Sequence, residues 1–212
     1  FSAKGFSVLL QALPDVGFAD ATGIVSLQRA IKSAPEIEFM RKAATISDSV
    51  MQGVMKYADI GMAKNQLVAL AYRDAMQGVD DAWGDYPAMP PMLSSGSDPA
   101  ARLLTWSGSP LVAGEDMIFS FSGCYRRYHA PLCRTIFLGE VSVEKRCAEA
   151  ALIESLDAGI AAATAGNRVS DVAKALAGPL GDGDNIGKGF GGLIGVAYPP
   201  SMEDNVITLN AD

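Results

Sequence analysis

The sequence predicts an α+β fold made of two halves that repeat one order of elements. Residues 34–139 carry signals for two helices, extended segments and a hairpin, and residues 142–198 repeat the helix pair and the extended run. The 212 residues are 49% hydrophobic and 19% charged, so the chain can bury a substantial core. No second hairpin follows the second extended run, and we expect the last strands of the fold to be missing.

The chain divides into a connector and one domain. Residues 1–33 mix short apolar pieces with turn formers, and we expect them to be a connector from an upstream domain. Residues 34–212 are expected to form one catalytic-type domain that is incomplete at its C-terminal end.

The first helix of this domain has a clear start signal. Ser33 stands at an N-cap position, Pro35 falls in the first turn, and Glu36 can complete a capping box. A long helix should continue toward Gly61 and bury the apolar residues that recur at helical spacing. We expect Ile37, Met40, Ala44, Met51 and Met55 to be buried, and Glu38, Lys42 and Asp48 to face solvent.

Turn residues and alternation indicate the later elements. Gly78 closes a second helix that begins at Ala63, and four prolines make residues 85–99 extended. Partial alternation over 117–138 predicts a bent hairpin that Gly139 closes. The second half then comprises helices over 142–165 and 169–180, a glycine-rich run over 181–196, and a strand-like stretch over 196–198.

Composition excludes several classes of function. There are 17 basic and 24 acidic residues, so the net charge of −7 repels phosphate backbones and anionic lipid, and we expect no nucleic-acid partner. Apolar runs fall short of the roughly 20 residues that cross a bilayer, so no membrane association is expected. Three cysteines make an odd count without metal-finger spacing, which favours a reducing compartment. We therefore expect a cytoplasmic protein.

Three blocks in order along the chain resemble one enzyme family. The string from Lys32 to Asp48 resembles the opening of the catalytic domain in the creatinase, aminopeptidase P and prolidase family, peptidase family M24. The hairpin from Gly123 to Gly139, with Arg134-Thr135 near its end, lies where that family has a paired-aspartate hairpin. Residues 191–196 are similar to its glycine-rich strand entry. The resemblance covers residues 30–212, and it implies the pita-bread fold, a hydrolase acting on a small molecule, and a homodimer.

The resemblance also implies that a metal site has been lost. Peptidases of this family hold two divalent metals with two hairpin aspartates, a histidine after the glycine-rich strand and two later glutamates. Here Ser120 and Pro131 occupy the hairpin positions, and Pro199 occupies the histidine position. These side chains do not bind a hard cation as carboxylate or imidazole does. We therefore expect no metal and no other cofactor.

Metal-free members of the family give the better match. The string from Gly123 to Thr135, with Leu104-Thr105-Trp106 before it and Tyr198-Pro199-Pro200 after it, is more similar to ectoine hydrolase-like members than to creatinase. Creatinase has a glutamate where this chain has Cys133. Leu103 replaces a histidine that the ectoine hydrolase pattern has, and the first hairpin strand lacks an acidic residue of that pattern.

The hairpin contains the candidate catalytic residues His129, Arg134 and Tyr128. His129 is the only histidine, so imidazole acid–base chemistry in this chain depends on it; the alternative is that it packs or caps the hairpin. Arg134 can clamp a carboxylate through two hydrogen bonds, and Tyr128 can orient substrate or stabilise charge. The alternative for the arginines is that Arg134 pairs with a structural carboxylate while Arg126 and Arg127 face water.

Aromatic residues suggest how a substrate is held. Trp106, Tyr125 and Tyr198 are the candidate substrate-binding residues, because an aromatic face attracts a compact cation; core packing is the alternative. Cys133 is interpreted as a buried, inert thiol in preference to a nucleophile.

The sequence thus predicts a metal-independent hydrolase of a C–N bond in a small nitrogenous solute, either ectoine hydrolase-like or creatinase-like. Two alternatives stay open. One is a metallopeptidase of the Xaa-Pro aminopeptidase or dipeptidase type, which bound manganese, cobalt or zinc would favour. The other is a non-catalytic pita-bread module that binds a protein or peptide, and it gains if no small molecule raises the melting temperature.

Overall fold

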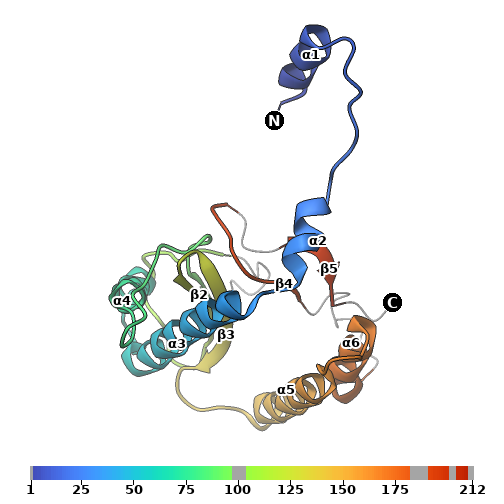
Figure 1. The fold of residues 1–212 in the computed structure, drawn as a ribbon. Helices are drawn as coiled ribbons and strands as arrows, with labels where there is room; N and C mark the ends of the chain where they lie inside the picture. The colour runs from blue at the N-terminus through green and yellow to red at the C-terminus, as the bar shows by residue number, and fades with distance from the viewer. Residues whose placement is uncertain (1, 97–103, 182–190, 201–203, 210–212) are drawn as a thin grey trace.

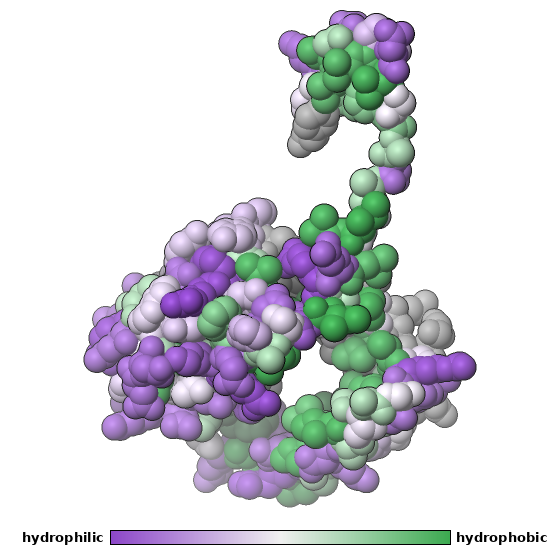
Figure 2. Space-filling model, in the orientation of Figure 1, coloured by the Kyte–Doolittle hydropathy of each residue, from purple (hydrophilic) through white to green (hydrophobic). Residues whose placement is uncertain are grey.

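The computed structural model describes residues 2–96, 104–181, 191–200 and 204–209. Two groups of elements lie on either side of an opening, and α1 stands apart from both (Figure 1; Figure 2). In chain order the elements are α1 Ala3–Ala12, α2 Ile24–Ala30, α3 Ala34–Tyr57, α4 Lys64–Gln77, β1 Met92–Ser95, β2 Asp116–Tyr125, β3 Tyr128–Phe137, α5 Val143–Ala162, α6 Val169–Ala177, the short 3-10 helix Gly178–Leu180, β4 Gly192–Leu193 and β5 Asp204–Thr208.

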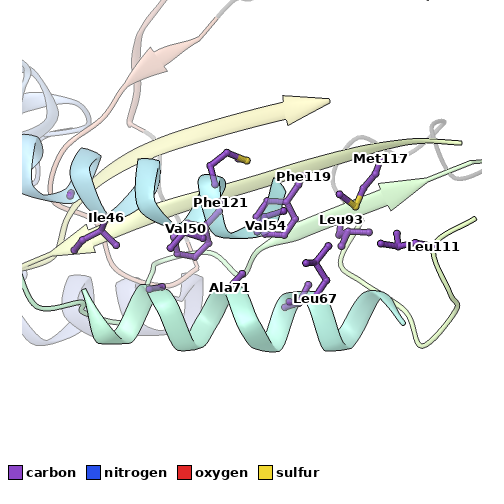
Figure 3. Close-up of a cluster of buried hydrophobic side chains, with 14 of the residues drawn as sticks. Ile46, Val50, Val54, Leu67, Ala71, Leu93, Leu111, Met117, Phe119 and Phe121 are labelled. Carbon is purple, nitrogen blue, oxygen red and sulfur yellow. The ribbon is translucent and has the colours of Figure 1, made fainter. Parts of the chain in front are cut away.

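The first group is a three-stranded sheet covered on one face by two helices. The antiparallel strands lie in the order β1, β2, β3; α3 packs on β2 and β3, and α4 packs on α3. Aliphatic side chains of the two helices meet aromatic side chains of β2 in one buried cluster (Figure 3). Its labelled members are Ile46, Val50, Val54, Leu67, Ala71, Leu93, Leu111, Met117, Phe119 and Phe121.

Helix α3 begins where the sequence predicts. The backbone amide and the hydroxyl of Ser33 both donate to the Glu36 carboxylate, at 2.7 and 2.6 Å. The predicted ends of α4 and of the hairpin are also confirmed. Gly78 follows α4 with φ +73°, and Gly139 follows the hairpin with φ +106°.

The predicted buried face of α3 is wrong for most of its residues. Of the expected set only Met51 is buried; Met40 and Ala44 are half-buried, and Ile37 and Met55 are exposed. The buried residues are Ala43, Ile46, Ser47, Val50, Met51 and Val54.

Small residues explain this shift of the buried face. A Cβ on Gly123 of β2 would lie 2.2 Å from the carbonyl oxygen of Ala43 and 2.7 Å from the hydroxyl of Ser47. The helix and the hairpin therefore touch backbone to backbone at this crossing, which only small residues allow. Lys42, expected in solvent, is half-buried: it pairs with the exposed Asp81, and its Nζ lies 5.2 Å from the centroid of the Tyr125 ring.

The second group is less buried. Ser142 caps α5, because its hydroxyl accepts a bond from the amide of Lys145 at 3.3 Å. Helices α5 and α6 pack on each other where Gly159 approaches Leu176, and α5 buries only Ser155 and Gly159. Strands β4 and β5 form a separate antiparallel pair.

Residues 1–33 contain two helices that the sequence analysis did not assign. Helix α1 buries no residue. The ring of Phe6 in this helix contacts the ring of Phe18 in the segment that follows it, with centroids 5.6 Å apart. Helix α2 reaches the second half, because the guanidinium of Arg29 donates to the carbonyl of Val196. In the described ranges no helix is both long and apolar enough to cross a membrane.

Candidate active site

The β2–β3 hairpin presents two different faces. Paired residues share a face and neighbours along a strand alternate between faces, so the register assigns each side chain. One face, with Phe119 and Phe121, packs on the helices. The other, which we call the inner face, carries the pairs Ser120 and Cys133, Ser122 and Pro131, and Cys124 and His129.

His129 is fully buried near the hairpin turn. Its Nε2 accepts the backbone amide of Ala88 at 2.9 Å, and its own amide donates to the carbonyl of Gly195 at 3.0 Å. Nδ1 is buried and has no hydrogen-bond partner among the described residues. Burial and the charge of Arg127 lower the pKa of His129. The imidazole is therefore neutral, and the bond from Ala88 assigns its proton to Nδ1.

Tyr128 and Tyr125 lie on the helix face. The Tyr128 hydroxyl donates to Oε1 of Glu36 at 2.9 Å. Bonds from Ser33 and from Tyr128 lower the pKa of Glu36 to about 2, while burial and the bond to Glu36 raise the pKa of Tyr128. Phe39 packs between the two tyrosines, with ring centroids at 5.5 and 5.9 Å.

Arg134 and Cys133 line a groove between the open end of the hairpin and α5. The groove has a volume of about 510 Å³, with charged groups at its rim and apolar side chains of α5 along its wall. Arg134 is exposed, and its Nη1 donates to the carbonyl of Cys133 at 2.7 Å. Cys133 is exposed at this groove, contrary to the prediction of a buried thiol. Desolvation raises the pKa of Cys133, so the thiol is protonated at neutral pH.

The other two aromatic candidates lie apart. Trp106 packs edge-on against Tyr72 of α4, with centroids 6.2 Å apart, at the margin of the core. Tyr198 is 59% exposed, and its ring lies over the guanidinium of Arg127 at 4.9 Å. The structure thus brings Tyr198 and His129 to one end of the hairpin and Arg134 to the other, with Trp106 outside this arrangement. Leu103 lies outside the described residues.

The donors on the inner face do not fit a site for two hard cations. Ser120 and Pro131 replace the aspartates that the family resemblance places there, and Pro199 is exposed at the histidine position. No group of three or more histidine, cysteine, aspartate or glutamate side chains in the described ranges is arranged to hold a metal.

Comparison with known proteins places this geometry in a family. Residues 38–208 match the family model of metallopeptidase family M24. This chain belongs to family M24. The matched residues include the β2–β3 hairpin and the helix pair α3 and α4.

Proteins similar to the M24 chain include an ectoine hydrolase, a prolidase and an X-Pro aminopeptidase by name. It is 40% identical over 99% of its length to the ectoine hydrolase of Halomonas elongata, and covers 54% of that protein. The prolidase from Pyrococcus furiosus is similar in structure, with TM-score 0.79, 18% identity, and coverage of 100% of this chain and 60% of that one. An X-Pro aminopeptidase from Thermotoga maritima gives TM-score 0.77 at 21% identity, with 99% and 58% covered. The last two likenesses show the pita-bread fold, and the chain spans about half the length of its curated relatives.

Sequence reasoning missed the most connected residue near the site, Arg127. The alternative reading had it facing water, yet the residue is 8% exposed. One signal was present. A two-residue hairpin turn with positive φ favours Asn-Gly, so two arginines at such a turn indicate that their side chains compensate with contacts.

Proposed function

We propose that this chain forms part of a hydrolase that opens a C–N bond in a small nitrogenous solute of the ectoine type without using a metal. The observation that carries the proposal is the 40% identity to an ectoine hydrolase along almost the whole chain. Ser120 and Pro131 support metal independence, because neither supplies the carboxylate that a hard cation needs.

The substrate class fits the groups that are exposed. Ectoine is a cyclic amidine that also carries a carboxylate, so it presents a positive and a negative group. The exposed guanidinium of Arg134 has the geometry to clamp a carboxylate through two hydrogen bonds, but it lies at the far end of the hairpin from Tyr198, so one small solute does not contact both. The exposed ring of Tyr198 can attract the amidinium, and it is the most exposed of the three aromatic candidates.

The reaction adds water to the amidine carbon and breaks one of its C–N bonds, leaving an amide and an amine. Water gives up a proton as it adds to the amidinium carbon, and the departing nitrogen takes a proton, so the step needs both a proton acceptor and a proton donor. In this proposal the Nδ1–H of neutral His129 is a hydrogen-bond donor at the Tyr198 end of the hairpin. Tyr128 and Arg134 take no part in the step, because the Tyr128 hydroxyl donates to Glu36 on the helix face and Arg134 lies at the other end of the hairpin. Because Nε2 already accepts a bond from Ala88, His129 serves as a donor and not as the base.

The test is proton NMR of the full protein mixed with ectoine in the presence of a metal chelator. We expect loss of the ring signals and the appearance of the ring-opened amide. Ring opening that stops with the chelator and returns with manganese, cobalt or zinc would contradict metal independence.

The same sample tests the other two candidate functions. Cleavage of Xaa-Pro dipeptides without attack on ectoine would identify a dipeptidase type. Turnover of neither compound, together with no rise in melting temperature on adding either, would identify a binding module. The homodimer stays a prediction of the family resemblance, which light scattering checks.

A further inference from the structure

Two adjacent arginines form the turn of the β2–β3 hairpin and point to different environments. Arg126 and Arg127 have φ of 48° and 68°, a left-handed conformation that is unfavourable for long side chains. Arg126 is exposed, and its guanidinium lies over the rings of Phe39 and Tyr125. Arg127 turns the other way and is buried. Neighbours in sequence with the same charge thus provide a matched pair.

The Arg127 side chain joins two segments that are far apart in the sequence. Its guanidinium donates to the carbonyl of Tyr86 and to the carbonyl of Ala197, the latter at 2.9 Å. It lies 3.7 Å from the Asp85 carboxylate. The rings of Tyr86 and Tyr198 lie over the same guanidinium, at 3.8 and 4.9 Å.

The backbone at this point continues the connection. The carbonyl of Arg127 accepts the amide of Ala197 at 3.0 Å, and Tyr128 forms a bridge with Val196. These bonds fix the segment as far as Ala197. The next side chain, Tyr198, is mostly exposed, and its ring lies against the guanidinium of Arg127.

We propose that Arg127 is a positioning residue that sets the place of the Tyr198 ring for substrate binding. This inference rests on the proposed function, in which Tyr198 contacts the substrate. A planar guanidinium can bond two carbonyls in its plane while aromatic rings lie over its surface. A lysine at this position keeps the charge but cannot make both kinds of contact, so Arg127→Lys should release the ring.

The experiment compares Arg127→Lys with Arg126→Lys in the full protein, measuring kcat and KM for ectoine ring opening. We expect Arg127→Lys to raise KM about tenfold with a smaller change in kcat, because displacing a substrate-positioning group weakens binding. Arg126→Lys should leave KM within about twofold, since its contacts lie on the other side of the turn. An unchanged KM in Arg127→Lys would overturn the proposal.

A double-mutant cycle tests whether Arg127 affects substrate binding through Tyr198 or only by stabilising the fold. If Arg127 acts through Tyr198, then Arg127→Lys should add little to KM once Tyr198→Ala is present. Two effects that multiply would show that Arg127 acts by another route, and would overturn the proposal.

Hydrogen exchange gives a readout that does not depend on any substrate. We expect the Ala197 amide to exchange about tenfold faster in Arg127→Lys than in the parent and in Arg126→Lys. If the parent does not open ectoine, the proposed function fails. The exchange rate of the Ala197 amide still tests whether Arg127 holds the segment at Ala197. Equal exchange in all three proteins would overturn the anchoring role of Arg127.

Discussion

The two helix pairs of the molecule start alike and are covered very differently. Helices α3 and α5 both begin after a serine cap, Ser33 and Ser142. Helix α3 then buries six residues against the hairpin, whereas α5 buries two and leaves Leu152, Ile153 and Leu156 more than half exposed. Local signals therefore decide where a helix begins, and tertiary packing decides how much it contributes to stability.

The sharpest test of this difference uses two close-packed glycines. Gly123→Ala should lower the free energy of unfolding by about 4 kcal/mol or prevent folding, because its Cβ meets the backbone of α3. Gly159→Ala should stay within about 1 kcal/mol of the parent, since its Cβ meets the side chain of Leu176, which can shift, and alanine favours a helix. Urea unfolding measures both. Equal losses would show that the second helix pair is as tightly constrained as the first.

A matched pair of isoleucines compares the coverage of the two helices. Ile46 in α3 is 1% exposed and Ile153 in α5 is 55% exposed. Ile46→Ala should lower the free energy of unfolding by about 3 kcal/mol through the cavity it leaves. Ile153→Ala should change it by less than about 1 kcal/mol. A large loss at Ile153 would mean that this face of α5 is covered in solution.

Two buried serines compare the hydrogen bonds of the two groups. Ser47 accepts the amide of Gly123 at 2.7 Å and donates to the carbonyl of Ala130, so it joins α3 to both strands. Ser155 donates only to the carbonyl of Leu176. Ser47→Ala should lower the free energy of unfolding by about 2 kcal/mol and Ser155→Ala by about 1 kcal/mol. The reverse order in thermal or urea unfolding would contradict this assignment.

The smallest expected effect is the response of the first group to acid. The pKa of His129 is lowered from 6.5, first by burial, so below that pH the unfolded chain binds a proton that the folded protein does not. Stability should thus fall as the pH drops from about 7 to 5 and level off below the folded pKa. His129→Gln keeps an acceptor for Ala88 and should remove this part of the slope. An identical slope in the variant, measured by urea unfolding at each pH, would assign the acid response to other groups.

The predictable parts of the fold are those with local causes. Ser33 with Glu36 marked the start of α3, and glycines at 78 and 139 marked stops, because a cap or a positive φ depends on neighbouring residues alone. The buried face of α3 was missed because hydrophobicity favoured Met40 and Met55. The actual contact is selected by small side chains that admit another backbone, which no local pattern reveals.

The candidate site was predicted only in part for a similar reason. His129, Tyr128 and Arg134 all lie on the hairpin as expected. Strand alternation nevertheless places His129 on the inner face and Tyr128 on the helix face. The partners of Arg127 come from residues 85–86 and 197–198, so its burial depends on contacts that sequence proximity cannot indicate.

The crossing of Ser47 and Gly123 also constrains how the chain folds. The two residues are 76 positions apart, so this contact belongs to the slow, non-local part of folding. During synthesis, α3 and α4 emerge before the hairpin exists and cannot bury their apolar faces until β2 and β3 follow. We expect nascent chains that stop before residue 116 to depend on chaperones, and those that include residue 138 to gain protection from proteases in their first helix pair.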